Sequence, residues 1–106
     1  MIEVSVIIPY FKKDKFIIET IYSIKNQTLK NFEIIIIDDE LTENSNKILS
    51  EVKKIDNRIK VYKNDFNSGA GLSRNLGIQL SKGKFVAFCD ADDLWESNKL
   101  EHQFCI

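Results

Sequence analysis

The stretch that decides the fold is Phe85-Val86-Ala87-Phe88-Cys89-Asp90-Ala91-Asp92-Asp93-Leu94-Trp95. Its first five residues are apolar without alternation, a pattern typical of a strand that is buried on both faces of a parallel sheet. Asp90, Asp92 and Asp93 follow at once. Because a strand fixes its own end rigidly, these carboxylates are expected at the carboxyl edge of the sheet, where open α/β sheets bind ligands.

Three carboxylates this close together can be interpreted in two ways. They repel one another unless they are protonated or share a cation, and hard divalent ions prefer oxygen ligands. The alternative is a solvated acidic turn that only ends the strand, since acidic turns are common. On these residues alone the two interpretations carry similar weight, and the rest of the chain has to separate them.

The bulk composition indicates one globular domain. The 106 residues are 43% hydrophobic and 29% charged, which is ordinary for a soluble chain that forms a single core. A net charge of −1 argues against nucleic acid as a partner. The start of the chain lacks the pattern of a signal peptide, and no apolar run is long enough to cross a bilayer. We therefore expect a cytoplasmic domain, in which Cys89 is a buried core residue and no disulfide forms.

Strand and helix patterns alternate along the whole chain. Short apolar runs at 4–8, 32–37, 59–62 and 85–89 predict strands, and Pro9 is expected to end the first of them. Residues at helical spacing follow, among them Leu72, Leu76 and Leu80, which are expected to line the third helix. This alternation predicts an α/β fold with a parallel, Rossmann-like sheet flanked by helices, and 3-2-1-4 is the most economical strand order.

In that order, three polar segments converge on one edge of the sheet. Asp38 and Asp39 follow the second strand, and the Asp90 segment follows the fourth. A fixed carboxylate can accept a hydrogen bond from a base imide or a ribose hydroxyl. Either acid alone is more simply a helix-entry residue. As a pair beside a second acidic strand end, they favour a ligand role for Asp39.

The loop from Asn64 to Gly71 leads into Arg74 at the start of a helix. Its glycines let backbone amides approach a ligand, although neither a Rossmann fingerprint nor a P-loop is present. Most basic residues of this chain are lysines, so an arginine at position 74 favours a specific role for its guanidinium, such as binding a diphosphate. The alternative is an ordinary solvated residue of the helix. The three segments together predict a nucleotide-type site.

Other candidates favour structural interpretations. Lys12 and Lys13 are expected on a solvated face. His102 has no second histidine or cysteine near it in the sequence, so an ordinary surface position is favoured. Trp95 is expected to cover the floor of the site or to pack on the final helix.

Several motifs in sequence order resemble the family 2 glycosyltransferases of the GT-A fold, over nearly all of the 106 residues. They are Val4 to Tyr10, Ser23 to Thr28, Glu33 to Asp39, Asn67-Ser68-Gly69 with Ser73 to Gly77, and Asp90-Ala91-Asp92-Asp93. Each is weak alone, but their combined order and spacing are specific. The resemblance implies that residues 1–106 are the N-terminal half-domain of such an enzyme, the half that binds a nucleotide sugar.

The resemblance also implies roles for individual residues. A sugar would pass from a nucleotide diphosphate, with UDP favoured, to a saccharide or lipid-linked acceptor hydroxyl with the help of Mn²⁺ or Mg²⁺. Asp90 and Asp92 resemble the Asp-X-Asp pair, the first nearer the ribose and the second on the metal. The implied donor-binding residues are Pro9, Tyr10, Asp38, Asp39, Arg74, Asp90 and Ala91, and the implied metal ligands are Asp92 and Asp90.

The sequence departs from the family pattern in two ways. Glu40 and Leu41 stand where the family usually has glycine and then serine or threonine, so this loop is expected to be less compact, with an extra carboxylate that disfavours a nearby diphosphate. Family enzymes are also roughly twice as long, which is a domain-sized difference. We therefore expect the acceptor half and the catalytic base beyond Ile106, and little activity from this length alone.

Three hypotheses remain open on the sequence. The first is the donor-binding part of a glycosyltransferase, and the second is a nucleotide-sugar-binding module without turnover. The third is a degenerate remnant without a ligand. Homo-oligomer formation through an exposed sheet edge and peripheral association of a full-length enzyme with the inner face of the membrane are further expectations.

Overall fold

The computed structural model describes residues 1–104, which form four strands and four helices in strict alternation. The elements are β1 (Val4–Tyr10), α1 (Ile17–Lys25), β2 (Phe32–Asp38), α2 (Glu43–Lys53), β3 (Ile59–Lys63), α3 (Ala70–Leu80), β4 (Phe85–Phe88) and α4 (Lys99–Phe104). Within these residues, no helix is both long and apolar enough to span a bilayer. Cys105 lies outside the described residues.

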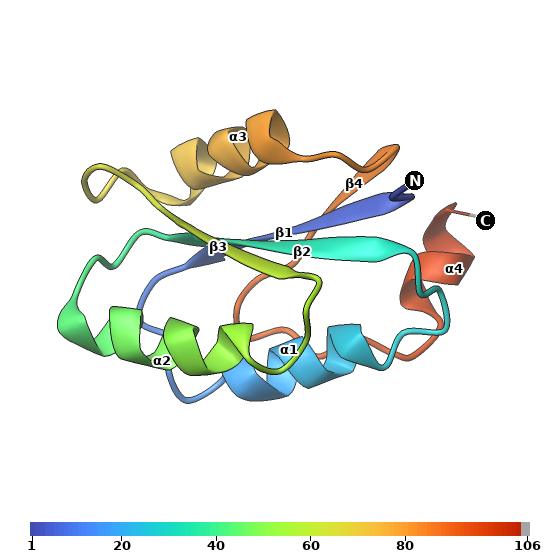
Figure 1. The fold of residues 1–106 in the computed structure, drawn as a ribbon, viewed down its shortest axis with the longest axis horizontal. Coiled ribbons are helices and arrows are strands. Elements are labelled where there is room, and N and C mark those ends of the chain that lie inside the picture. Colours follow the sequence, from blue (N-terminus) through green and yellow to red (C-terminus); the bar gives the residue numbers. More distant parts are fainter. Residues whose placement is uncertain (105–106) are drawn as a thin grey trace.

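The strands form one parallel sheet in the order β3-β2-β1-β4. This confirms the predicted fold class and strand order. In Figure 1, α3 covers one face of the sheet, and α1 and α2 cover the other. Ile7 of β1 is aligned with Ile35 of β2 and Phe88 of β4, so the carboxyl ends of these three strands reach the same edge of the sheet.

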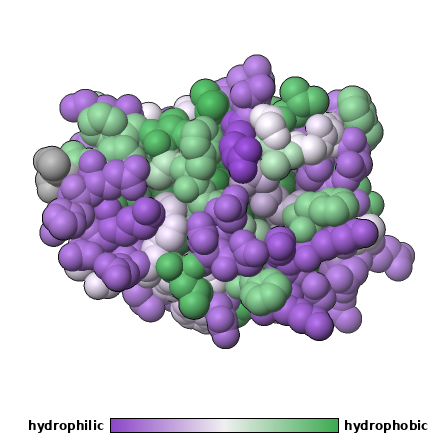
Figure 2. All heavy atoms as spheres, turned by 180° about the vertical axis from the view of Figure 1, so that it is seen from behind, coloured by the Kyte–Doolittle hydropathy of each residue, from purple (hydrophilic) through white to green (hydrophobic). Residues whose placement is uncertain are grey.

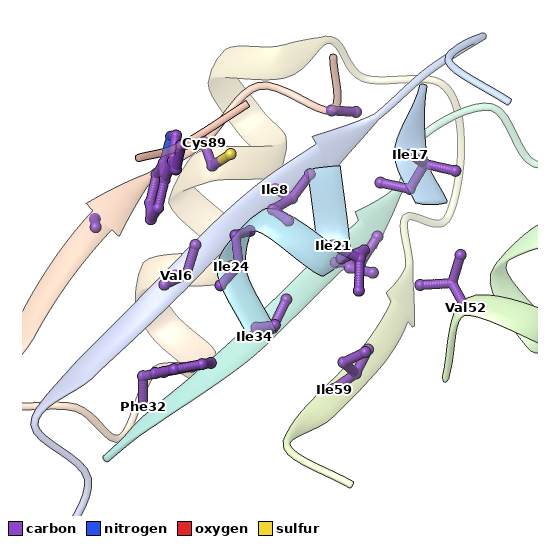
Figure 3. Close-up of a cluster of buried hydrophobic side chains, with 14 of the residues drawn as sticks. Val6, Ile8, Ile17, Ile21, Ile24, Phe32, Ile34, Val52, Ile59 and Cys89 are labelled. Carbon is purple, nitrogen blue, oxygen red and sulfur yellow. The ribbon is translucent and has the colours of Figure 1, made fainter. Parts of the chain in front are cut away.

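The main core lies between the sheet and α1. Ile17, Ile21 and Ile24 recur at helical spacing along α1, and all three are fully buried. They face alternate residues of the central strands, such as Val6 and Ile34 (Figure 3). This packing holds the central strands in place against α1. It therefore also fixes the position of the polar residues that follow their carboxyl ends.

The opposite face of the sheet is covered by the small residues of α3. Ser73 and Gly77 are its buried residues, whereas Leu72 is 57% exposed. The expectation that Leu72, Leu76 and Leu80 line the buried face is therefore wrong for Leu72, and Leu76 and Leu80 are only partly buried. The physical reason is that the helix lies close to β1. At Gly77 there is no room for a side chain, because Ile7 lies directly against it.

The expectation that β4 is buried on both faces is also wrong. β4 is the edge strand, with Phe85 38% and Phe88 48% exposed, and Ala87 is its buried residue. Phe85 stacks on Phe104 of α4, whereas Phe88 lies beside Ile7 in the register. Seen from behind Figure 1, exposed hydrophobic side chains form separate small patches among hydrophilic ones (Figure 2).

Pro9 does not end β1, which continues through Tyr10. The carbonyl of Ile7 accepts from Cys89 on the β4 side, and the carbonyl of Tyr10 accepts from Asp39 on the β2 side. Because backbone groups alternate along a strand, the missing N–H of Pro9 falls on the β4 side, where the paired residues of β4 end at Phe88. The ladder between β1 and β4 therefore stops beside Pro9, whereas pairing with β2 continues to Tyr10.

Candidate functional site

A cleft of about 370 Å³ opens at the carboxyl ends of the central strands. Residues of three segments surround it: the end of β1 with its following loop, the Asp39 turn with the start of α3, and the segment after β4. They are Pro9, Tyr10, Phe11, Lys13, Asp39, Ala70, Arg74, Asp90, Ala91 and Asp92. Every site residue predicted from the sequence lies here except Asp38. Phe11, Lys13 and Ala70 were not predicted to line the site.

The exposed carboxylates of Asp90, Asp92 and Asp93 form one group at the rim of this cleft. Each can offer an oxygen, and these oxygens all lie within 4.8 Å of one another. The turn is held by the Asp93 amide, which donates to the Asp90 carbonyl at 3.0 Å. An all-oxygen donor set with room for water suits a hard divalent cation such as Mg²⁺ or Mn²⁺. Asp93, which the sequence places in the same acidic group but outside the implied metal pair, adds a potential third ligand.

Two cations approach these carboxylates from the other walls. Lys13 Nζ lies 3.1 Å from Asp92 Oδ2, and Arg74 Nη2 lies 3.7 Å from Asp90 Oδ1. All four side chains are 39–67% exposed, so each pair contributes little to folding. The expectation that Lys13 belongs to a solvated face is wrong, because its ammonium group lies in the cleft. Arg74 also lies in the cleft, beside Asp90.

Asp39 is buried and anchors the loop before α3. Its Oδ1 accepts from the Asn64 amide group and the Ser68 backbone, both at 2.7 Å, and its Oδ2 accepts from the Gly69 backbone at 2.9 Å. A carboxylate offers about four lone-pair positions, so these three bonds leave one acceptor position on Oδ2. Asp39 can therefore hold the loop and accept one further hydrogen bond from a ligand.

Asp38 faces away from the cleft. Its Oδ1 accepts from the backbone amides of Glu40 and Leu41, and its Oδ2 accepts from the Ser45 hydroxyl of α2 at 2.9 Å. The capping box of Thr42 and Ser45 then begins α2. Asp38 thus shapes the turn that carries Asp39, and its carboxylate is not among the groups that line the cleft.

Glu40 makes hydrogen bonds within its own turn and to the loop after β1. Its carboxylate accepts from the Lys12 backbone amide at 2.9 Å and from the Thr42 hydroxyl at 2.5 Å. The extra charge expected to disfavour a diphosphate is therefore directed at the loop after β1, and Glu40 is not among the cleft residues. Leu41 adopts a left-handed conformation with φ 62°, which favours glycine.

Polar side chains of α1 position the acidic segment. The Thr20 hydroxyl donates to the Ala91 carbonyl at 2.8 Å, and Ser23 Oγ accepts from the Trp95 amide at 3.2 Å. Just after α1 ends, the buried Gln27 donates to the Glu96 carbonyl and accepts from the Leu100 amide. Thr20 and Ser23 lie on one face of α1, and together with Gln27 they hold the segment from 91 to 100 against this helix and its C-terminal end.

The titratable core residues beside the cleft are not poised for proton transfer. Burial, followed by the charges of Asp93 and Asp90, raises the pKa of Cys89 to about 12. Burial and the charge of Glu40 raise the pKa of Tyr10 to about 12. Both groups stay protonated near neutral pH, so neither is a nucleophile or base.

A second cavity of about 680 Å³ lies under the segment after Asp93. Trp95 is 9% exposed and forms part of its wall, with the Lys99 ammonium group 5.3 Å from its ring. Trp95 therefore packs toward the final helix, one of its two expected positions. His102 also lines this cavity and not the acidic cleft.

The model of the family described as Glycosyl transferase family 2 matches residues 5–104. The chain therefore belongs to this glycosyltransferase family, and its fold is the N-terminal part of the GT-A fold. The glycosyltransferase TuaG of Bacillus subtilis (strain 168) is 41% identical over 100 residues, which are 94% of this chain and 40% of TuaG.

Two further proteins show the same relationship. WfgD of Escherichia coli, a UDP-Glc:α-D-GlcNAc-diphosphoundecaprenol β-1,3-glucosyltransferase, is 37% identical over 94% of this chain and 39% of its own length. The structure of S. aureus TarS 1–349 in complex with UDP-GlcNAc superposes with a TM-score of 0.87 at 29% identity, over 98% of this chain and 30% of TarS 1–349. The chain thus spans about 40% of the length of the curated relatives named here.

Proposed function

We propose that this chain is the donor-binding region of a glycosyltransferase that binds a UDP-sugar together with Mn²⁺ or Mg²⁺. The observation that carries the proposal is the convergence of Asp39, Arg74, Asp90 and Asp92 on one cleft. These side chains come from three separate segments and supply an acceptor, a cation and a pair of metal-ligating carboxylates. WfgD, named for a UDP-Glc donor, and TarS 1–349, solved with UDP-GlcNAc, support the choice of UDP.

Each wall of the cleft has a proposed role. Asp39 accepts from the imide N–H of uracil with its remaining acceptor position, and Pro9 and Tyr10 form the wall beside the base. Arg74 binds the phosphates, because a planar guanidinium matches phosphate oxygens. Asp90 contacts the ribose, with Ala91 held beside it by Thr20. We do not assign Asp38 a donor contact, because its carboxylate faces α2 and does not line the cleft.

Asp92 and Asp90 are the proposed metal ligands, and Asp93 completes the oxygen set. A divalent ion bound there supplies positive charge against the diphosphate leaving group. Arg74 adds its charge beside Asp90. The residues of this chain thus bind, orient and neutralise the donor, and none of them is assigned the proton of an acceptor hydroxyl.

The remaining parts of the reaction are proposals from the partial coverage of the relatives. We propose that the acceptor surface and the catalytic base lie in sequence after Ile106. We propose a saccharide or a lipid-linked saccharide as the acceptor, and peripheral association of the full-length enzyme with the inner face of the membrane; the lipid-linked acceptor in the name of WfgD supports both. The exposed β4 edge is the proposed surface for self-association, which concentration-dependent sedimentation would test.

Calorimetry of UDP binding tests the proposal. UDP should bind more tightly in Mn²⁺ than in chelator, and Asp92→Asn should remove most of that gain. The matched control is Asp65→Asn, because Asp65 is an exposed acid that does not line the cleft. Equal affinity for UDP in Mn²⁺ and in chelator would contradict the metal assignment, and no UDP binding in either would contradict the site.

A further inference from the structure

Lys13 connects two walls of the cleft that are far apart in the sequence. Its ammonium group lies 3.1 Å from Asp92 Oδ2, across 79 residues of chain. Lys13 and Asp92 are 41% and 40% exposed, so water and a ligand can reach both. The contact therefore lies at the mouth of the cleft, and it occupies an oxygen of one of the proposed metal ligands.

The backbone that carries Lys13 is fixed on both sides. The preceding amide, that of Lys12, donates to Glu40 Oε1 at 2.9 Å, and Lys12 adopts φ 53°. The Lys13 carbonyl accepts from the amides of Phe16 and Ile17, both at 3.0 Å. These hydrogen bonds hold the backbone, and the long side chain of Lys13 allows its ammonium group to turn while its Cα stays in place.

The charges of the cleft imply that a metal ion and the Lys13 ammonium group compete for Asp92. A divalent ion that binds Asp92 competes for the oxygen that the Lys13 ammonium group now occupies. An ammonium group is a point charge on a flexible stem and binds phosphate well. Once displaced, it remains in the cleft that Arg74 also lines, where the proposed donor places its diphosphate.

We propose that Lys13 is an exchanging cation: it neutralises Asp92 when no metal is bound and moves to the diphosphate when metal and nucleotide enter together. This inference rests on the proposed function and adds a residue to it. The exchange therefore affects the two binding affinities in opposite directions. Lys13 weakens the binding of metal alone and strengthens the binding of nucleotide diphosphate with metal.

The test uses the 106-residue chain with Lys13→Met, which keeps the length of the side chain and removes its charge. The binding of Mn²⁺ alone is measured from the electron paramagnetic resonance signal of the free ion. We expect Mn²⁺ affinity to rise about two- to five-fold, the range for loss of a half-exposed competing pair. The binding of UDP in saturating Mn²⁺ is measured by calorimetry, and its affinity should fall about five- to ten-fold through the loss of a charge-assisted hydrogen bond.

Two further variants separate the contact from general charge. Lys15→Met removes the same charge two residues away, from an exposed lysine that does not line the cleft. It should change both affinities less than two-fold, since exposed charges are screened. Lys13→Arg keeps a cation within reach and should preserve most of the affinity for UDP.

The possible results are distinct. Higher Mn²⁺ affinity together with lower UDP affinity in Lys13→Met, but not in Lys15→Met, supports the exchange. Unchanged or lower Mn²⁺ affinity, or unchanged UDP affinity, overturns it while leaving the proposed function intact. A parent chain that binds no UDP in Mn²⁺ overturns the proposed function, and the diphosphate role of Lys13 with it.

Discussion

Gly77 of α3 lies directly against Ile7 of β1, so closely that a Cβ at position 77 would overlap the Ile7 side chain. Ile7 is fully buried at the centre of the sheet, so it cannot move aside cheaply. This contact sets the distance between α3 and the sheet. It therefore also sets how far the start of α3, with Ala70 and Arg74, reaches over the cleft.

Gly77→Ala is expected to destabilise the fold. Overpacking of a buried contact costs about 1–3 kcal/mol, which exceeds the gain of up to about 1 kcal/mol in helix propensity. Gly71→Ala is the matched control, because Gly71 lies in the same helix with open space around it, and it should stabilise by about 0.5–1 kcal/mol. Urea unfolding followed by circular dichroism measures both. A Gly77→Ala chain as stable as the parent would contradict the close approach.

Asp39 should select the base of the nucleotide. An ionised carboxylate accepts hydrogen bonds but cannot donate, so it favours uracil, which offers an imide N–H, over cytosine, which does not. UDP should bind more tightly than CDP by about 1–3 kcal/mol, the cost of an unmade hydrogen bond at a buried polar group. Calorimetry with both nucleotides in Mn²⁺ is the measurement. Equal affinity for CDP and UDP would rule out this role.

Thr20→Val should weaken metal binding without touching a metal ligand. The substitution keeps the shape of the side chain but removes the hydroxyl that donates to the Ala91 carbonyl, between Asp90 and Asp92. Loss of this buried bond is expected to cost about 1–3 kcal/mol of stability and to loosen the acidic turn. Titration of Mn²⁺ checks the effect. Thr28→Val is the control, because Thr28 is exposed; similar Mn²⁺ affinities for both variants would argue against a positioning role.

Asp56 should contribute to stability in a pH-dependent way. Hydrogen bonds from Arg58 lower the pKa of Asp56 from 3.8 to about 2, and Arg58 also stacks on Phe32 and donates to the Lys30 carbonyl. A lowered pKa gives stability that is fully present above pH 4 and is lost as the pH falls through 2. Asp56→Asn should therefore cost about 2 kcal/mol at pH 7 and about half of that at pH 3.

Urea unfolding of the parent and Asp56→Asn chains between pH 3 and pH 7 gives this difference. Asp65→Asn serves as the control, since Asp65 is exposed and lies outside the pair. A difference between the Asp56→Asn and parent chains that stays constant with pH would show that the variant acts through packing and not through charge.

The 106-residue chain should bind a donor but transfer sugar slowly at best. Direct displacement needs an acceptor hydroxyl held in line and a base that receives its proton, and we assign neither to this chain. A radiolabelled-donor assay with a panel of acceptors should show hydrolysis to water at most. A longer chain that extends past Ile106 should transfer sugar faster by orders of magnitude. Equal rates would require a base among Asp93, Glu96 and His102.

The sequence alone was sufficient for the order of the sheet and for the edge at which the candidate site residues meet. Alternating strands and helices allow few topologies, because crossovers are right-handed and neighbouring strands tend to pair. Asp39 and Asp90 each follow a strand, so the parallel order brings them to one edge. Arg74 could be placed there too, because the loop before its helix starts at the same edge.

Tertiary structure decided which of the candidate side chains face the cleft. Asp38 and Asp39 are adjacent and chemically alike, but alternation at the strand end directs Asp38 to α2 and Asp39 to the loop before α3. Lys13 was indistinguishable from a solvated lysine until the fold brought Asp92 beside it. The exposure of β4 was hidden for a similar reason, since an apolar run does not reveal how many neighbours its strand will have. The local spacing of apolar residues determines whether a segment forms a strand or a helix and which of its faces is apolar. Contacts between residues far apart in the sequence depend on how the elements pack, which only the folded chain defines.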